Sequence, residues 1–368
     1  MSLNGHMLIK TLNQLAHPKL AVPKDKIGLQ VGRPDAPVDG IFITLDVTEA
    51  VVDEAIALGA NWIVAHHAVI FNPLTEIRTD QEKGRLLAKL LQHNMQVFIA
   101  HTNLDTALGG VNDVLAEKLQ LAHTEVLIPH YHEPLKKLVV FVPETHIEQV
   151  REAISKAGAG HIGRYSHCTF NLAGEGTFMP QEGTSPYIGH EGKLEQVREI
   201  RLETIITGEI EDQVLQHLYE AHPYEEIAYD IYLLENRGTA YGLGRIGDLP
   251  REMTVKQFAA YVKECYGVKG LRVVGRSDGL VQRVAVLGGS GGRYFDHAKQ
   301  KGADAYITGD IDFHTAQDAL ASEMVMIDPG HHIEHLAMAQ FAEHIREKLK
   351  QTIPIHVSKV DTNPFWFV

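Results

Sequence analysis

The chain has 368 residues, of which 44% are hydrophobic and 22% are charged, a composition typical of a soluble globular protein with more than one domain. Its 34 basic and 47 acidic residues give a formal charge of −13, which argues against a general nucleic-acid binder. The sequence has neither an apolar run of roughly 18 residues nor a signal-peptide pattern, so we expect a cytoplasmic protein without membrane contact. Two cysteines, Cys168 and Cys265, are too few for a disulfide framework or a cysteine-based zinc site.

The first third of the chain alternates between predicted strands and predicted helices. Apolar runs bounded by turn residues predict strands at 41–45, 61–65 and 97–100. Capping residues and apolar side chains at helical spacing predict helices over 48–58 and 80–93. This alternation is typical of an α/β domain with a mostly parallel sheet.

The C-terminal part of the chain repeats this pattern. Segments 55–67 and 298–310 share a Gly-Ala pair and a following apolar strand at identical spacing. A predicted strand at 284–287 precedes the second segment as the strand at 41–45 precedes the first, and a further strand is predicted at 325–327. We therefore expect two similar α/β halves that form one core; chance similarity between two βαβ units is the alternative.

A different block lies between the halves. Strands are predicted at 137–142, 167–172, 197–206 and 228–234, and helices at 144–156 and 209–221. This β-α-β-β-α-β order is that of a ferredoxin-like domain. The glycine-rich stretch 174–192 is its expected long hairpin connection, and linkers are expected near Pro129, Pro134, Gly238 and Gly242. The expected domains are thus the first half over 1–128, the inserted domain over 129–236 and the second half over 237–368.

Histidines follow three of the predicted strands in the two halves. They are His66 and His67 after 61–65, His101 after 97–100, and His331 after 325–327. Because ligands of open α/β sheets bind at the carboxyl ends of the strands, we expect these imidazoles to converge. Asp105 and Glu334 follow His101 and His331 at helical or turn spacing, so each carboxylate is expected to face the same point as its histidine.

Imidazoles and carboxylates together suit a divalent metal ion, with zinc as the first choice and iron, manganese, nickel or cobalt as alternatives. The candidate ligands, His66, His67, His101, Asp105, His331 and Glu334, exceed the four that one tetrahedral ion needs. A carboxylate can bridge two ions, so we predict two divalent ions per chain, roughly 3.5–4 Å apart, that activate water. His101 either binds an ion directly or orients a neighbouring ligand.

Three other motifs have two interpretations each. The glycine run 288–292 either cradles a phosphate with its backbone amides or forms a tight strand-to-helix turn. Asp310 and His314 either shuttle protons in the same cleft, or Asp310 caps a helix. Segment 222–226, which reads His-Pro-Tyr-Glu-Glu, either binds a metal or turns into a strand.

Taken jointly, these motifs resemble those of the dinuclear-metal-centre proteins known as GTP cyclohydrolase I type 2 homologues, or Nif-three-like proteins. The matching segments lie in both halves, at 25–32, 65–67 with 70–71, 100–105 with 109–113, 288–291, 308–310 with His314, and 330–331 with Glu334. The middle block resembles the extra domain of the longer bacterial members, which is similar to the nitrogen-regulatory and copper-tolerance folds.

The resemblance implies metal ligation by five of the candidate residues, His66, His67, Asp105, His331 and Glu334, with His101 contributing in some members. It also implies a ring-shaped homohexamer and hydrolytic opening of the guanine imidazole ring of GTP, a small-molecule substrate, with release of formate. The chain departs from the family's His-His-Pro segment, since Ala68 and Val69 follow His67. This changes the loop beside the metals rather than the ligand set, and it leaves substrate specificity open.

Two alternative functions fit the same residues. One is a dinuclear metal phosphoesterase that acts on a nucleotide or another small phosphorylated substrate. The other is a non-catalytic hexameric scaffold or regulator, in which the metal ions and the inserted domain serve assembly or ligand sensing.

Overall fold

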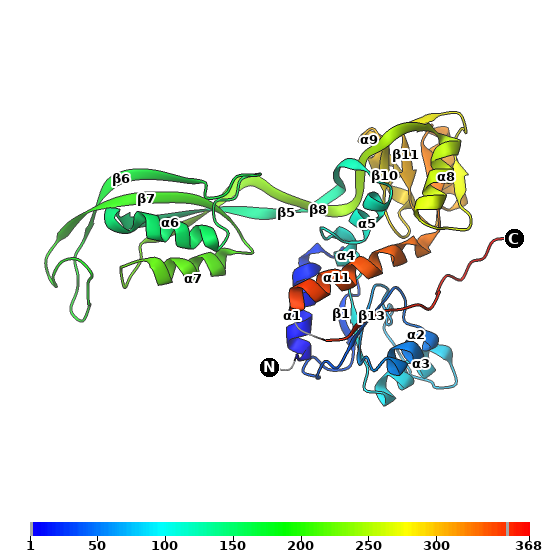
Figure 1. The fold of residues 1–368 in the computed structure, drawn as a ribbon, viewed down its shortest axis with the longest axis horizontal. Coiled ribbons are helices and arrows are strands. Elements are labelled where there is room, and N and C mark those ends of the chain that lie inside the picture. Colours follow the sequence, from blue (N-terminus) through cyan, green and yellow to red (C-terminus); the bar gives the residue numbers. More distant parts are fainter. Residues whose placement is uncertain (1–2, 351–352) are drawn as a thin grey trace. The chain divides into compact units, whose positions relative to one another are not determined.

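The structure is a computed structural model that describes residues 3–350 and 353–368. The chain forms two compact units, one of Met1–Tyr131 with Tyr241–Val368 and one of His132–Ala240. Two long strands, β5 (Ala122–Pro143) and β8 (Tyr229–Thr254), carry the chain from the first unit into the second and back (Figure 1). Within the described ranges, no helix is both long enough and apolar enough to cross a bilayer.

The N-terminal half of the larger unit is built on a five-stranded sheet of order β1-β4-β3-β2-β13. The strands are β1 (Gly28–Val31), β2 (Ile41–Thr44), β3 (Trp62–Ala65), β4 (Gln96–Ile99) and β13 (Ile355–Val357). All neighbouring pairs are parallel except β1 with β4. Strands β2, β3 and β4 are buried along their whole length, which explains why they are continuous apolar runs.

Helices cover both faces of this sheet (Figure 1). Helices α1 (Gly5–Leu15) and α11 (Met338–Leu349) pack on one face, and α2 (Glu49–Ala57) and α3 (Glu82–Gln92) pack on the other. Successive strand residues point to opposite faces, so Trp62 packs with the first pair of helices and Ile63 with the second.

The second half of this unit repeats the arrangement of the first. Its parallel strands are β10 (Leu280–Val286), β11 (Ala305–Ile307) and β12 (Val325–Asp328), and β9 (Arg272–Val274) pairs antiparallel with β12. In the first half, β2, β3 and β4 are parallel in the same order, and β1 pairs antiparallel with β4. The two similar halves that the sequence predicts are therefore present, and the mixed α/β fold is confirmed.

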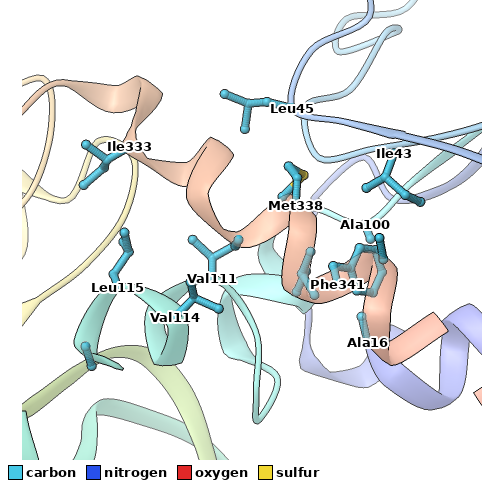
Figure 2. Packing of buried hydrophobic residues seen from close by; sticks show 14 of the residues in the cluster. Ala16, Ile43, Leu45, Ala100, Val111, Val114, Leu115, Ile333, Met338 and Phe341 are labelled. Carbon is cyan, nitrogen blue, oxygen red and sulfur yellow. The ribbon is translucent and has the colours of Figure 1, made fainter. Parts of the chain in front are cut away.

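One hydrophobic cluster joins the two halves. It combines Ile43 of the first sheet and Val284 of the second with buried residues of α5 (Val111–Lys118), α8 (Val255–Cys265) and α11. Figure 2 shows Met338 and Phe341 of α11 in this cluster together with Val111 and Val114 of α5. Because both sheets are fixed to one core, the loops after their parallel strands keep a constant position relative to each other.

The strands of the smaller unit follow the order β6-β7-β5-β8 within an eight-stranded sheet, where β6 spans Thr169–Phe178 and β7 spans Glu195–Thr207. Strand β7 pairs antiparallel with both β5 and β6. Helices α6 (Ile147–Lys156) and α7 (Glu211–Ala221) bury their apolar residues against the strands, in a cluster that includes Val140, Ile154 and Leu218. The elements follow the predicted β-α-β-β-α-β order.

The predicted start of the long connection in this unit was wrong. Strand β6 continues past Gly174 to Phe178, so the connection covers 179–194. Gly176 pairs with Val197 in the ladder, and a Cβ on Gly176 would lie 2.1 Å from Glu199 Oε2. Gly176 therefore makes room for the Glu199 side chain of the neighbouring strand, and neither Gly174 nor Gly176 ends β6.

The predicted linker residues lie inside strands. Pro129 and Pro134 belong to β5, and Gly238 and Gly242 belong to β8. A Cβ on Gly238 would lie 2.4 Å from Glu133 O, and a Cβ on Gly242 would lie 2.0 Å from Ile128 O. Glycine at these positions permits a close approach of β8 to β5, which the sequence pattern cannot distinguish from a flexible linker.

The cluster that joins the halves predicts a large cost for removing Phe341, which is buried within it. We expect Phe341→Ala to lower the free energy of unfolding by about 3–5 kcal/mol, because a cavity replaces the aromatic ring. Leu320→Ala, at a position that is 56% exposed on α10 (Phe313–Ala321), is the control and should change it by less than about 0.5 kcal/mol. Urea unfolding measures both; equal effects would contradict the shared core.

Candidate metal centre

The six predicted site residues meet at the carboxyl ends of the parallel strands. His66 and His67 directly follow β3, His101 precedes the short helix α4 (Thr102–Thr106), and His331 begins the 3-10 helix η4 (His331–Ala337) after β12. Asp105 lies on α4 and Glu334 on η4. One turn of helix brings Glu334 beside its own histidine, 3.2 Å from His331 Nε2, whereas Asp105 is grouped with His66 and Glu334 and not with His101. The sequence-based prediction that these residues converge is therefore met in the fold.

The residues form three overlapping groups whose potential ligand atoms lie within 4.8 Å of one another. The groups are His66 with His67 and His101, His67 with His331 and Glu334, and His66 with Asp105 and Glu334. Glu334 belongs to two of them, as do His66 and His67. Each group has a donor set that can hold a divalent ion, and sharing of a carboxylate is the arrangement of a bridged pair of ions.

Glu334 is the buried carboxylate at the centre of this arrangement. Its Oε2 lies 3.0 Å from His67 Nε2, 3.2 Å from His331 Nε2 and 3.7 Å from His66 Nε2. The first and third of these imidazoles come from the N-terminal half, whereas His331 and Glu334 come from the C-terminal half. The centre therefore requires both halves.

Two buried polar atoms in the centre have no hydrogen-bond partner among the described residues. They are Nε2 of His66 and Oδ1 of Asp105, and they lie 3.4 Å apart. Burying such atoms without a partner is costly. A cation between them would satisfy both, since the imidazole nitrogen and the carboxylate oxygen are both electron-pair donors. The residues of the centre thus fit a metal ion on their own geometry.

Each imidazole is held by a hydrogen bond through its other nitrogen, Nδ1. The acceptors are the Ala100 carbonyl for His66 at 2.8 Å, Asp46 for His67 at 2.7 Å, Asp25 for His101 at 2.8 Å and Asp310 for His331 at 2.7 Å. Because these oxygens only accept hydrogen bonds, Nδ1 carries the proton in each neutral ring. Nε2 is left as the lone-pair donor, which is the usual arrangement of histidine ligands.

Burial and neighbouring charges separate the pKa values of the imidazoles. Burial lowers the pKa of His66 to about 3, so this ring is neutral at pH 7. Burial also opposes protonation of His67, but its hydrogen bonds to Asp46 and Glu334 raise its pKa to about 10. The hydrogen bond to Glu334 raises the pKa of His331 to about 9. Positive charge is therefore favoured next to Glu334.

The pKa values of the two buried carboxylates, Asp105 and Glu334, are shifted in opposite directions. Burial and the nearby charge of Glu334 raise the pKa of Asp105 well above its usual value. Burial acts in the same sense on Glu334, but hydrogen bonds from His331 and His67 outweigh it and lower its pKa. Two carboxylates in one buried site repel each other, and a divalent cation is the group that relieves this repulsion.

The glycine run after β10 allows Glu334 to approach this loop closely. A Cβ on Gly289, which has φ +65°, would lie 2.7 Å from Glu334 Oε1. The amide of Gly288 donates to Asn112 Oδ1 and that of Gly291 to Thr308 Oγ1. Since these two amides are engaged, the tight-turn interpretation of the run is favoured over a phosphate cradle.

The remaining motifs either have structural roles or hold a histidine of the centre in position. Asp310 accepts a hydrogen bond from His331, while Asp312 caps α10, so the predicted capping role of Asp310 was wrong. His314 is exposed beside Phe313, with ring centroids 5.7 Å apart. His222 uses both ring nitrogens, one on the Phe141 carbonyl and one on the Tyr224 amide, which favours the turn interpretation of 222–226.

Sequence reasoning missed Asp46, which lies just after β2 and accepts a hydrogen bond from His67. The signal was present, because Asp46 follows a buried strand in the same way as the histidines do. Asp310 also has φ +53°, a left-handed conformation that is strained for a residue with a side chain and is concentrated at functional sites.

A cavity of about 1490 Å³ adjoins the centre. His67 and His331 line it, together with their partners Asp46 and Asp310. His66 and Asp105 are not part of its wall, and both are buried. A substrate would therefore reach the centre from the side of His67 and His331.

The unpartnered oxygen of Asp105 predicts opposite effects of Asp105→Asn with and without metal. At pH 7 the variant should melt at or above the temperature of the parent in chelator, because an amide removes the repulsion with Glu334. The rise in melting temperature that zinc gives the parent should be lost, because one ligand is missing. Differential scanning calorimetry measures both, and an undiminished zinc effect would contradict the ligand role of Asp105.

The hydrogen bond from His331 to Asp310 predicts weaker metal binding in Asp310→Asn. We expect metal affinity to fall by about 10–100-fold, because the amide holds the imidazole less well in the correct tautomer. Competition with a fluorescent zinc chelator measures the affinity. Asp318→Asn, an exposed position on α10, is the control and should leave the affinity unchanged. Equal affinities for both variants would show that Asp310 does not orient His331.

The chain is similar to a known protein family over almost its whole length. The model of the family described as Duf34/NIF3 (NGG1p interacting factor 3) matches residues 3–364. The chain is 49% identical over 374 aligned residues to a Bacillus subtilis (strain 168) protein named GTP cyclohydrolase 1 type 2 homolog, covering 100% of this chain and 99% of that protein. A relative of the same name from Mycobacterium tuberculosis (strain ATCC 25618 / H37Rv) is 36% identical over 370 residues, covering 99% and 97%.

Two solved structures are also similar to the chain over its whole length. A Bacillus cereus protein related to NIF3 superposes with a TM-score of 0.94 at 50% identity, covering 100% of both chains. The Staphylococcus aureus protein SA1388 superposes with a TM-score of 0.75 at 29% identity, covering 100% of this chain and 99% of that one. On the family match over nearly the whole chain and on these relatives, the chain belongs to the Duf34/NIF3 family.

Proposed function

We propose that this centre binds two divalent metal ions, with zinc as the first choice, and that the protein is a metal-dependent hydrolase. The observation that carries the proposal is the position of Glu334, whose carboxylate belongs to two ligand groups at once. One group would use His67 and His331, and the other would use His66 and Asp105. His101 would complete the second group or support His66.

Bound divalent ions would supply water of lowered pKa and a positive charge that stabilises developing negative charge on the substrate. The chain contributes the positions of the ligands. Asp46 and Asp310 fix the rings of His67 and His331, which lie on the cavity wall where a substrate arrives. The burial of His66 and Asp105 keeps bulk water away from the inner side of the centre.

We further propose that the substrate is a purine nucleotide such as GTP and that the reaction opens the imidazole ring by hydrolysis with release of formate. The names of the curated relatives support this choice, since they are called GTP cyclohydrolase 1 type 2 homologues. The cavity of about 1490 Å³ exceeds the roughly 300–1,000 Å³ typical of small-molecule sites, so it has room for a nucleotide. The homohexamer implied by the family resemblance stays a prediction.

The proposal predicts about two metal ions per chain and formate release from GTP. Elemental analysis of protein purified without chelator gives the metal content, and a coupled formate assay gives the turnover. Glu334→Gln should lose metal and lower turnover by about a hundredfold, because it removes the shared ligand. Glu347→Gln, an exposed position on α11, is the matched control and should behave like the parent.

The outcome of this experiment also separates the alternatives. Release of phosphate without formate would contradict ring opening and indicate a phosphoesterase. Two bound ions without turnover of GTP or other nucleotides would contradict the hydrolase proposal and favour a metal-binding scaffold. A metal content near zero would contradict the centre itself.

A further inference from the structure

The cavity beside the centre is lined by three lysines that have no acidic partner among the described residues. Lys118, Lys269 and Lys359 reach it from three separate parts of the chain, and all three are exposed. Within the described part of the chain, none of these ammonium groups forms an ion pair. In a protein with a formal charge of −13, three free lysines around one cavity create a local preference for an anionic ligand.

Three of the four aspartates on the same wall are paired with an arginine or with imidazoles of raised pKa, namely Asp46 with His67, Asp310 with His331 and Asp328 with Arg272. Asp361 lies 3.7 Å from His332, whose pKa is lowered by burial, so Asp361 is one negative charge against three lysines. The lysines are therefore the charges left available to a ligand. Phosphate groups suit them, since the ammonium group of lysine binds phosphate as a compact point charge.

The C-terminal tail forms another part of the cavity wall and is anchored at two points. The Thr362 hydroxyl donates a hydrogen bond to Asp46, which also binds His67. Farther along, the ring of Phe367 packs on Gly270, where a Cβ would lie 2.5 Å from Phe367 Cδ1. The tail is thus connected to the centre through Asp46 and held against the opposite loop by Phe367.

Trp366 lies between these anchors, lines the cavity and is 76% exposed. None of the ring pairs among the described residues includes it, so its indole face is free to stack. Base–aromatic stacking is a common use of an exposed aromatic side chain at a binding site. A planar aromatic group carried by an anionic ligand would use Trp366 and the lysines together.

We propose that Trp366 and the three lysines form a nucleotide-binding subsite, in which the base stacks on the indole and the lysines hold the phosphates. This inference rests on the proposed function, which requires a purine nucleotide at the metal centre, and it names the residues that select that substrate. His67 and His331 line the same cavity, so a ligand held in this subsite lies next to the centre.

The chain contains its own reporter for this inference, because it has only two tryptophans. Trp62 is fully buried in the core, whereas Trp366 is exposed. Titration of the metal-loaded protein with GTP should quench the fluorescence of the exposed Trp366 and leave the fluorescence of the buried Trp62 unchanged. Trp366→Phe should remove the quenched signal. If saturating GTP does not quench the emission, or if quenching persists in Trp366→Phe, the inference is overturned.

Calorimetric titration with parts of the nucleotide separates the two roles. Trp366→Ala should weaken binding of GTP and guanosine by about tenfold and leave tripolyphosphate unaffected, because only the base stacks. The double variant Lys118→Gln, Lys269→Gln should weaken GTP and tripolyphosphate by about tenfold and leave guanosine unaffected. Tyr165→Ala, at a position that is also 76% exposed, and Lys10→Gln are the controls. Parent-like GTP binding by both test variants would overturn the inference.

The result is distinguishable from a failure of the proposed function. Quenching of Trp366 by GTP without formate release would contradict ring opening and support the subsite. Formate release without quenching, and with parent-like GTP binding by Trp366→Ala, would support the hydrolase and overturn the subsite.

Discussion

The carboxylate of Glu334 is the group on which the centre depends. It is buried, and one of its oxygens lies within 3.7 Å of imidazole nitrogens from both halves of the larger unit. A buried charge persists only when other charges or hydrogen bonds compensate it. Here the imidazoles of His67 and His331 supply that compensation, and the unpartnered atoms of His66 and Asp105 mark where a cation would add to it.

The fold meets this requirement by repeating one α/β arrangement and fusing the copies through a common core. Three parallel strands with an antiparallel edge strand occur in each half, and one apolar cluster joins them. The carboxyl ends of both strand sets therefore face a single site. Local backbone geometry completes the fit: Gly330 with φ +89° turns the chain from β12 into η4, and Gly289 allows Glu334 to lie against its loop.

The centre and the cavity share Asp46. This side chain orients the imidazole of His67 and also accepts a hydrogen bond from Thr362 at the base of the C-terminal tail. Two hydrogen bonds, from Thr362 to Asp46 and from His67 to Asp46, therefore connect the tail to a proposed metal ligand. A nucleotide that contacts the tail would lie close to this connection. The proposed nucleotide subsite and the proposed metal centre are thus neighbours in the larger unit. The family match over residues 3–364 covers the centre and the three lysines and ends before Trp366.

The sequence by itself determined the central parallel strands of the two halves, the helices α2 and α3 and the six residues of the centre, because a buried strand followed by a histidine is a local pattern. Strand periodicity and the spacing of Asp105 and Glu334 are likewise local. Only the tertiary structure decided which distant residues meet, how the ligands are held and where the cavity lies. Glu334 and His67 are 267 positions apart, and the support of His67 by Asp46, the length of β5 and β8, and the cavity with Trp366 and its lysines arise from contacts between distant segments. Such contacts depend on how the elements pack, so they cannot be predicted from any short stretch of sequence.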